Sequence, residues 1–346
     1  MLLKVNLEKA QQLLIEKIPP LVEETVSIIE AAGRVLAEDL IAENNLPTWP
    51  SAAQDGYALH ANDLEGHKTI SLASLTGELS LPPLKSGETF AVRTGEVVPE
   101  NTAAVVTHEE VEIRDQEIYL GKLVATGSCI RQAGEDFKLG ELYARRGTTI
   151  TPGLIAAAAA QGRPEVKVYS RPRIGVLSLG RQLVPLDQEP VCGEVRDCNG
   201  PLLAALAGRD GARVTTVELL DKEPSAVICH LREILAQVDL LLTIGGTYTR
   251  GENEVRLLFE ELGGKMLFWG IPMQPGGHNG AALWNQKMLV SLSGNPAACA
   301  VGYELLVAPV IRALQGKKPY PLWVKAQCLD TVSAKGGERR FVRAQI

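Results

Sequence analysis

The sequence predicts a multi-domain chain that combines an α/β domain with a β-rich domain. The chain has 346 residues, which is too long for one ordinary domain. Strand-like apolar runs alternate with helical patterns between Arg173 and Gly316, as in βαβ units with a mostly parallel sheet covered on both faces. Between His60 and Leu139 the chain is rich in Gly, Pro, Thr and Val, which favours short strands separated by turns.

Composition and charge narrow the class of protein. With 45% hydrophobic and 22% charged residues, the composition is that of a soluble globular protein. A net charge of −6 argues against a nucleic-acid-binding or polybasic membrane surface. The N-terminus has no signal-peptide pattern, and the longest apolar run, residues 154–160, is too short to span a bilayer. We therefore expect a cytoplasmic protein that binds neither nucleic acid nor membrane.

The six cysteines are scattered without CxxC spacing, so neither a zinc site nor a disulfide framework is indicated. We expect reduced thiols, as is usual in the cytoplasm. The five histidines form no metal-ligand pattern, and His278, in a Gly-rich stretch, is interpreted as a surface-loop residue. The absence of GxxxxGK[ST] and GxSxG gives no support to P-loop or α/β-hydrolase chemistry.

Helical signals lie on both sides of the β-rich segment. Apolar spacing predicts a helix over residues 7–18 with Asn6 as N-cap, and a shorter helix over residues 27–32. A third helix begins at Thr151-Pro152 and ends at Gly162. We expect these helices to be neighbours, which makes the β-rich segment an insertion. The predicted domains are a helical linker domain (1–48 and 140–171), the inserted β-rich domain (49–139), the α/β domain (172–316) and a last segment (317–346).

Individual elements follow from the local patterns. Residues 35–41 are expected to be extended, and the β-rich domain is expected to contain strands at 69–72, 103–106 and 117–120. The predicted strands of the α/β domain are 173–179, 213–219, 239–244, 266–269 and 288–292, and its predicted helices are 200–208, 224–236, 254–262 and 296–314. The last segment suggests one or two strands with a basic turn at 335–340, and it is too short to bury a core alone.

Three predicted strands end in loops suited to a ligand. Gly180 follows the first, Gly245-Gly246 the third and Ser293-Gly294-Asn295-Pro296 the last. In open α/β sheets ligands bind beyond the carboxyl ends of the strands, and glycine lets the backbone come close to them. Pro296 opens a helix, so free N–H groups at its start can hold a phosphate; a tight turn that binds nothing is the alternative.

The acidic candidates lie in turns, at Asp55, Glu135-Asp136, Asp197 and Asp221. Clustered carboxylates can hold Mg²⁺ together with substrate phosphate oxygens, although turn carboxylates are more often solvated or cap a helix. Arg250, just past the glycine pair, is either a phosphate-binding fork or a solvated surface arginine.

These segments, in their order, resemble the MoeA family of molybdopterin molybdenumtransferases, which includes the C-terminal part of gephyrin-type proteins. The resemblance runs from the N-terminal helix to about Arg343. The segments that carry it are SAAQDGYA (51–58), RTGEVVPENTAAVV (93–106), IRQAGEDFKLGE (130–141), VLSLGRQL (176–183), RDCNG (196–200), the Gly245-Gly246 loop, MQPGG (273–277) and SGNPAA (293–298).

The resemblance implies an elongated homodimer whose active site lies between the α/β domain of one subunit and the β-rich domain of the other. The α/β domain would be a MogA-like, three-layer molybdopterin-binding domain, and residues 317–346 a truncated C-terminal β-domain. The implied reaction takes adenylylated molybdopterin and molybdate, hydrolyses the adenylate with Mg²⁺ and inserts molybdenum into the dithiolene. Molybdopterin adenylyltransferase, molybdoenzymes and their chaperones are the implied partners.

Asp55, Asp136, Asp221 and Pro296 stand where the family's motifs have the same residues, and their roles are carried over. Asp55, Asp136 and Asp221 are expected to be the catalytic, metal-associated acids. The expected substrate contacts are Gly180, Asp197, Asn199, Gly245, Gly246, Thr247, Arg250, Gln274, Pro275, Gly276, Ser293, Gly294, Asn295 and Pro296.

Several positions depart from the family pattern. Arg181 and Gln182 stand where two carboxylates are expected, and Asn253 replaces a third acid. Lysines are absent at Gly270, Gln274 and Gly277, and Ser293 replaces a proline. Loss of acids weakens Mg²⁺ binding, and loss of lysines weakens oxyanion binding. The resemblance makes a molybdenum-inserting transferase the leading hypothesis, and the substitutions motivate two alternatives. The alternatives are a catalytically impaired paralogue acting as pterin carrier, scaffold or regulator, and altered chemistry on a related anionic substrate.

Overall fold

The computed structural model describes residues 4–66, 68–72, 82–220, 224–246, 254–321, 324–327, 329, 339–342 and 344. The chain divides into two compact units. The α/β unit comprises Met1–Glu38, Arg146–Ile155 and Glu165–Ile346, and the β-rich unit comprises Asp39–Arg145 and Ala156–Pro164. The finer division into four domains stays a prediction.

A six-stranded sheet organises the α/β unit, in the order β17-β14-β18-β22-β21-β19. Its strands are β14 (Arg173–Leu179), β17 (Arg213–Leu220), β18 (Leu240–Gly245), β19 (Lys265–Trp269), β21 (Gly280–Trp284) and β22 (Lys287–Leu292). The pairs β17–β14, β14–β18 and β18–β22 are parallel, whereas β21 runs antiparallel to both its neighbours. Only β21 therefore runs against the others, and the expected mostly parallel sheet is confirmed. The sequence reading missed β21.

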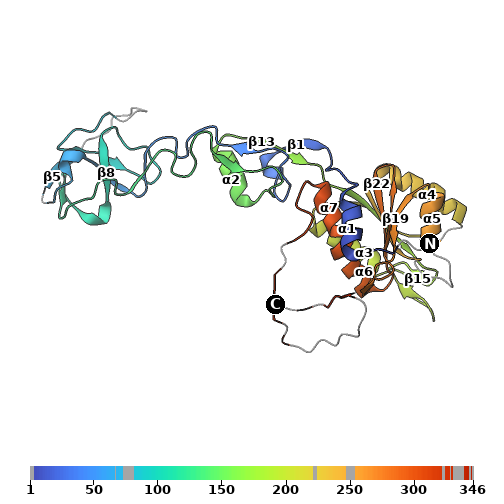
Figure 1. Cartoon of the computed structure of the whole chain (residues 1–346). Coiled ribbons are helices and arrows are strands. Elements are labelled where there is room, and N and C mark those ends of the chain that lie inside the picture. Colours follow the sequence, from blue (N-terminus) through green and yellow to red (C-terminus); the bar gives the residue numbers. More distant parts are fainter. Residues whose placement is uncertain are drawn as a thin grey trace. The chain divides into compact units, whose positions relative to one another are not determined.

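Helices cover both faces of this sheet (Figure 1). The helices are α1 (Leu7–Ile15), α3 (Asn199–Arg209), α4 (Pro224–Gln237), α5 (Glu254–Glu261), α6 (Pro296–Gly302) and α7 (Ala308–Leu314), with one π-helical turn, η4 (Tyr303–Val307), between the last two. Successive side chains of β18 point to opposite faces of the sheet. Leu240 and Leu242 pack with α1, α3, α6 and α7 on one face, whereas Leu241 packs with α4 and α5 on the other.

The first helix belongs to this core. Asn6 caps α1 as expected, because its Oδ1 accepts a 2.8 Å hydrogen bond from the Lys9 N–H. Leu7, Ala10 and Leu14 are buried in the same hydrophobic cluster as the sheet, and α1 contacts α7 and β19. The helix α1 therefore packs on the core of the α/β unit, and its assignment to a helical linker domain stays a prediction. The apolar face of α1 is covered by the sheet and α7.

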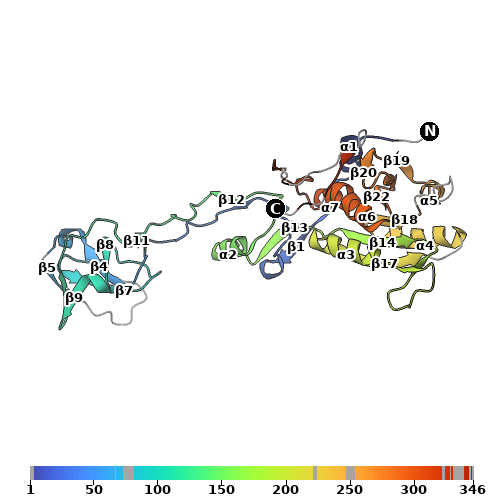
Figure 2. The ribbon, with the colours of Figure 1, turned by 90° about the horizontal axis from the view of Figure 1, so that it is seen from below.

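Four short elements lie near the boundaries between the two units in the sequence. They are β1 (Glu23–Ser27), η1 (Ile28–Glu30), α2 (Pro152–Ala160) and β13 (Glu165–Tyr169), and β1 pairs antiparallel with β13 (Figure 2). The helix expected at 27–32 is only the single 3₁₀ turn η1, which ends before Gly33 at φ 73°. The helix expected at residue 152 is confirmed as α2, whereas β1 and β13 were not predicted.

The β-rich unit contains short strands, as predicted. They are β2 (Leu40–Ile41), β3 (Ser51–Ala52), β4 (Gly56–His60), β5 (Lys68–Leu72), β6 (Glu88–Thr89), β7 (Ala91–Val92), β8 (Thr102–Thr107), β9 (Val111–Arg114), β10 (Glu117–Leu120), β11 (Ile130–Arg131) and β12 (Leu142–Ala144), with the 3₁₀ turns η2 (Ala61–Asp63) and η3 (His108–Glu110). The main sheets have the orders β6-β5-β10-β9 and β7-β4-β8. The expected strands at 69–72, 103–106 and 117–120 are β5, β8 and β10.

Small strand pairs complete the α/β unit. They are β15 (Leu183–Val184) with β16 (Val195–Arg196), and β20 (Met273–Gln274) with β23 (Arg339–Arg340). The strand β23 coincides with the last two residues of the basic turn expected at 335–340, so these two residues form a strand and not a turn. Residues 335–338 lie outside the described residues.

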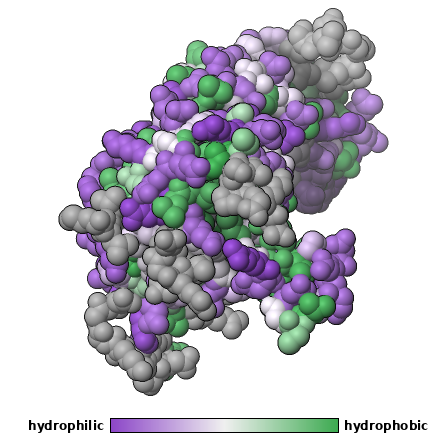
Figure 3. All heavy atoms as spheres, turned by 90° about the vertical axis from the view of Figure 1, so that its right-hand side faces the viewer, coloured by the Kyte–Doolittle hydropathy of each residue, from purple (hydrophilic) through white to green (hydrophobic). Residues whose placement is uncertain are grey.

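One helical stretch, Pro296–Leu314, is long and apolar enough to cross a membrane, judged over the described residues. Within the α/β unit 72% of it is buried, and Val310, Ile311 and Leu314 lie in the hydrophobic cluster of the sheet. It is therefore a core helix of this unit. On the face drawn in Figure 3, hydrophilic side chains predominate and apolar ones gather in small groups.

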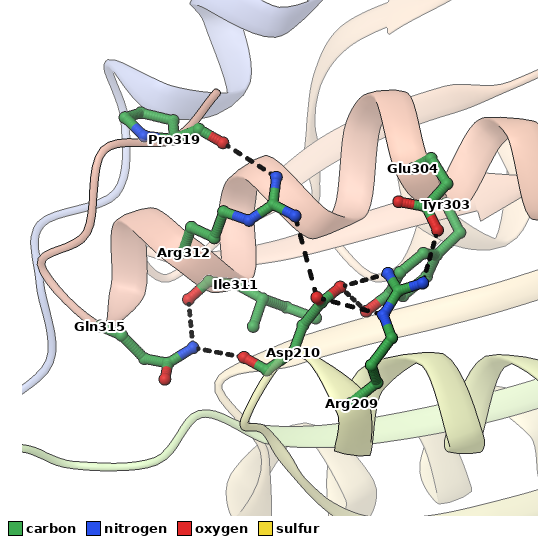
Figure 4. Close-up of polar contacts among 8 residues, drawn as sticks. All are labelled: Arg209, Asp210, Tyr303, Glu304, Ile311, Arg312, Gln315 and Pro319. Carbon is green, nitrogen blue, oxygen red and sulfur yellow. Dashed lines mark hydrogen bonds and ion pairs between the residues drawn. The ribbon is translucent and has the colours of Figure 1, made fainter. Parts of the chain in front are cut away.

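A polar cluster fastens the end of this helix to α3 (Figure 4). The Tyr303 hydroxyl donates a 2.8 Å hydrogen bond to Asp210 Oδ2, and Arg209 forms ion pairs with both Asp210 and Glu304. Gln315 Nε2 donates to the Asp210 carbonyl at 2.9 Å. Because Asp210 follows α3 directly, the cluster connects both helices on this face of the sheet.

Candidate functional site

A crevice of about 440 Å³ lies beyond the carboxyl ends of β14 and β18. Gly180, Gly245, Gly246 and Gly294 line it, as expected from the three strand-end loops. Its remaining walls are Leu179, Arg181, Gln182, Leu183, Asn199, Ile244 and Glu254. The parallel strands bring these loops to one edge of the sheet, so the predicted convergence is found.

Glycine is required in the middle loop by conformation and by space. Gly245 and Gly246 have φ of 80° and 60°, a region that L-residues other than glycine rarely adopt. A Cβ on Gly245 would lie 2.3 Å from the Leu179 carbonyl oxygen, and one on Gly246 would lie 2.8 Å from Val255 Cγ2. The loop therefore presents bare backbone to the crevice, with β14 and α5 directly behind it.

Asn199 fastens two of the loops together. Its side-chain amide donates a 2.7 Å hydrogen bond to the Gly294 carbonyl oxygen. Asp197, 8% exposed, holds the start of α3, because its Oδ1 accepts hydrogen bonds from the N–H groups of Asn199 (3.0 Å) and Gly200 (3.1 Å). Asp197 is therefore a cap that positions Asn199, and it does not itself line the crevice.

The start of α6 differs from the expectation of free N–H groups. Asn295 Oδ1 accepts hydrogen bonds from the N–H groups of Ala297 (3.0 Å) and Ala298 (3.2 Å), and the Asn295 carbonyl accepts one from Cys299 (2.8 Å). Pro296 has no N–H. Each N–H of the first turn thus has a partner within the chain, so a phosphate at this helix end would have to displace the Asn295 side chain, and the expected phosphate contact stays a prediction.

A buried residue that the sequence reading missed, Asn279, orders the loop before α6. Its Oδ1 accepts hydrogen bonds from the Ser293 N–H (3.0 Å) and the Ser293 hydroxyl (3.2 Å). Gly276 lies directly beside it, because a Cβ there would be 3.1 Å from Asn279 Nδ2. The loop of Gln274, Pro275 and Gly276 thus supports the Ser293 loop through Asn279, and these three residues do not line the crevice.

Buried polar atoms without a hydrogen-bond partner among the described residues gather at this end of the sheet. They are Ser178 Oγ, Asn199 Oδ1, Thr243 Oγ1, Asn279 Nδ2 and Ser291 Oγ. Thr243 and Ser291 are direct neighbours in the β18–β22 register. Unpaired buried polar groups are rare in folded proteins and call for a ligand, ion, water or strain as explanation. Their concentration at the crevice end of the sheet supports this edge as the candidate site.

The charges around the crevice are balanced. Arg181 and Glu254 are its charged lining residues, and both are exposed. Glu254 is the first residue of α5, and the sequence analysis did not predict it as a site residue. Its position shortly after the glycine pair could have indicated it. Thr247, Arg250 and Asn253 lie outside the described residues, as does Asp221.

The other two predicted catalytic acids belong to the β-rich unit, and each has its own partner there. The Asp55 carboxylate accepts hydrogen bonds from the Thr94 N–H (2.7 Å) and hydroxyl (2.8 Å), which lower its pKa. Asp136 forms an ion pair with Arg131, whose pKa that hydrogen bond raises. Among the described residues, no three or more His, Cys, Asp or Glu side chains lie together in a way that could hold a metal ion.

Two family models and several curated proteins are similar to this chain. Residues 5–162 match the MoeA N-terminal region (domain I and II), and residues 175–313 match a probable molybdopterin binding domain. The molybdopterin molybdenumtransferase of Haemophilus influenzae is 30% identical over 320 residues, which cover 91% of this chain and 79% of that protein. The protein of the same name from Staphylococcus epidermidis is 27% identical over 328 residues, 92% of this chain and 78% of that protein.

The fold is similar to that of a solved structure. The molybdopterin biosynthesis MoeA protein from Pyrococcus horikosii superposes with a TM-score of 0.76 and 27% sequence identity. The superposition covers 91% of this chain and 81% of that chain.

Proposed function

The chain belongs to the MoeA family, and we propose that it acts in molybdenum cofactor biosynthesis as a molybdopterin molybdenumtransferase. The proposed substrates are adenylylated molybdopterin and molybdate. Water hydrolyses the adenylate and AMP leaves, and the two dithiolene sulfurs bind molybdenum in place of molybdate oxygens, which leave as water. The observation that carries the proposal is the crevice of about 440 Å³, in which three strand-end loops meet beside a group of unpaired buried polar atoms.

The proposal assigns each wall of the crevice a role in substrate binding. The bare backbone at Gly245 and Gly246 lets a phosphate or pterin approach closely, and Asn199 keeps the Gly294 wall in place. Arg181 supplies a permanent positive charge beside the substrate phosphates or the molybdate oxyanion. A cation at that place stabilises the negative charge that develops as the phosphate bond breaks.

The Mg²⁺ requirement stays a prediction. The described acids do not form a magnesium site within this chain: Asp55 is hydrogen-bonded to Thr94, and Asp136 is paired with Arg131. No step is therefore derived through the ion, and its role is left to an activity assay with and without Mg²⁺.

Binding of adenylylated molybdopterin tests the location of the site. A Cβ on Gly294 would lie 3.4 Å from Gly245 Cα, so Gly294→Val fills the crevice and should abolish binding in a calorimetric titration. Gly208→Ala is the matched control, because nothing lies within 4 Å of a Cβ at that position in α3. Equal affinity of both variants and the unmodified protein for adenylylated molybdopterin would show that the binding site lies outside this crevice.

A second candidate function is favoured by Arg181 and Gln182, which line the crevice at positions where the family resemblance predicts carboxylates. In this second proposal the chain binds the pterin without turnover and serves as a carrier, scaffold or regulator. The double variant Arg181→Asp, Gln182→Glu tests it. A large gain in AMP release would identify a site that has lost catalytic acids, whereas unchanged turnover would favour altered chemistry on a related anion.

The proposal also covers the oligomeric state, the location and the partners of the protein. We expect a homodimer in the cytoplasm that exchanges cofactor with molybdopterin adenylyltransferase and with molybdoenzymes or their chaperones. Light scattering coupled to size-exclusion chromatography measures the mass in solution. A mass of one chain, 37.2 kDa, at micromolar concentration would contradict the homodimer.

A further inference from the structure

A second cavity, of about 510 Å³, lies at the opposite ends of the same parallel strands. Arg173 begins β14, Arg213 begins β17, and Asp239 directly precedes β18; all three line the cavity. Arg173 and Arg213 are neighbours in the β14–β17 register. The candidate crevice adjoins the last residues of β14 and β18, so the two cavities are separated by the length of the sheet.

The lining of this second cavity is positively charged. It contains four arginines, Arg34, Arg171, Arg173 and Arg213, and two carboxylates, Glu24 and Asp239. Four positive and two negative charges leave an excess of two positive charges, within a chain whose net charge is −6. A local excess of this sign in an acidic protein attracts an anion specifically to this place.

Two of the arginines are held in place by the chain. Arg173 forms a two-pronged contact with Asp239, with Nη2 donating to Oδ1 at 2.8 Å and Nε to Oδ2 at 3.1 Å. Arg34 pairs with Glu24 and donates a 2.9 Å hydrogen bond to the Tyr169 carbonyl oxygen. These two guanidinium groups are the fixed part of the wall, and they use up both carboxylates.

The other two arginines keep their donors available. The guanidinium groups of Arg171 and Arg213 make no hydrogen bond or ion pair with any residue in the described ranges, and both residues are exposed. The Arg213 backbone is nonetheless fixed, because its N–H donates to the Pro172 carbonyl at 2.8 Å. The fixed backbone of Arg213 and the neighbouring Arg171 therefore present two guanidinium forks at the edge of one cavity.

We propose that this cavity binds the phosphate group of a phosphorylated small molecule. A phosphate monoester carries about two negative charges at neutral pH, which matches the local excess. Guanidinium groups bind phosphate oxygens through two parallel hydrogen bonds, and Arg171 and Arg213 supply the forks. The volume lies in the range of small-molecule sites, and the side chains of Leu21 and Val22 offer an apolar wall for the rest of the ligand. The inference stands on this cavity and does not require the proposed transferase.

Calorimetric titration with inorganic phosphate, pyrophosphate and a sugar phosphate at low ionic strength tests the inference. We expect saturable binding that falls by at least about tenfold in the double variant Arg171→Ala, Arg213→Ala, since charged hydrogen bonds are lost. Arg232→Ala is the matched control: this exposed arginine on α4 also has no partner among the described residues and does not line the cavity. It should bind like the unmodified protein.

Either of two kinds of outcome, no binding at all or binding that does not depend on Arg171 and Arg213, would overturn the inference. The first is no saturable binding of any of the three probes to the unmodified protein. The second is unchanged binding in the double arginine variant, or loss of binding in Arg181→Ala instead, which would place the anion in the crevice at the other end of the sheet. Equal melting temperatures of all variants would show that a loss of affinity is not a loss of fold.

Discussion

The side-chain amide of Asn199 donates a 2.7 Å hydrogen bond to the backbone carbonyl of Gly294, across 95 residues of sequence. Asn199 opens α3, which follows the loop after β14, and Gly294 follows β22. The strand between them, β18, contributes Gly245 to the same crevice. The Asn199 side chain therefore links the segment after β14 to the segment after β22, on either side of the loop that follows β18.

Replacing Asn199 should loosen this site without unfolding the chain. Asn199→Ala removes the bond to Gly294, and we expect affinity for adenylylated molybdopterin to fall about tenfold, as for loss of one well-placed hydrogen bond. The measurement is a calorimetric titration, with Asn62→Ala, an exposed asparagine of the β-rich unit, as control. Unaltered affinity in Asn199→Ala would mean that the Gly294 wall is held by other contacts.

The glycine pair gives a prediction on stability. Gly245→Ala adds both an unfavourable φ and a Cβ 2.3 Å from the Leu179 carbonyl oxygen, so it should cost more than about 2 kcal/mol of the free energy of unfolding. Gly193→Ala has a similar φ, 95°, but nothing within 4 Å, so it should cost only about 1–2 kcal/mol. Urea unfolding measures both. Equal costs would show that the close approach to β14 can relax.

Tyr303 gives a prediction on alkaline stability. Burial, followed by the neighbouring Asp210 charge and its hydrogen bond, raises the pKa of Tyr303 far above the ordinary value of 10. Because the folded pKa is the higher one, this stabilisation is complete below pH 10 and is lost as the pH rises above it. Tyr303→Phe should be about 1–3 kcal/mol less stable at pH 7, and the difference should shrink above pH 10. A constant difference across that range would contradict this account.

The cysteines give a prediction on reactivity. Burial raises the pKa of the Cys299 thiol to about 12, whereas Cys192, Cys198 and Cys229 are exposed. Iodoacetamide at pH 8 should therefore modify these three in the folded protein and reach Cys299 only after unfolding, because the thiolate is the reactive form. Peptide mass spectrometry measures the order. Labelling of Cys299 as fast as Cys192 would show that α6 opens readily.

Strands and helices with a clear local sequence pattern were predicted well from the sequence. The uninterrupted apolar run at 173–179 is β14 to the residue, and Gly180 ends it as expected. The strand β13 was missed even though Glu165–Tyr169 alternates between exposed and buried residues, a pattern present in the sequence. The strand β21, Gly280–Trp284, has no alternation, and only its pairing between β19 and β22 makes it a strand.

Contacts between distant segments were harder to predict. The helical spacing of α1 was recognised, but its partner α7 lies almost the whole chain away. Convergence of the loops at Gly180, Gly245 and Gly294 followed from the rule for parallel sheets. The role of Asn279 has no local signal, because it arises from burial beneath the Ser293 loop. The sequence correctly predicted that Asn295 directly precedes a helix. Its side chain, however, accepts hydrogen bonds from the N–H groups that a phosphate was expected to bind.

The most direct test of the central claim is AMP release from adenylylated molybdopterin by the purified protein, measured with and without Mg²⁺ and molybdate. If the chain is the proposed transferase, AMP appears over many turnovers only when both are present, and Gly294→Val abolishes it. Tight binding of the substrate with no AMP release under any of these conditions would contradict the transferase and leave the pterin carrier or scaffold as the function.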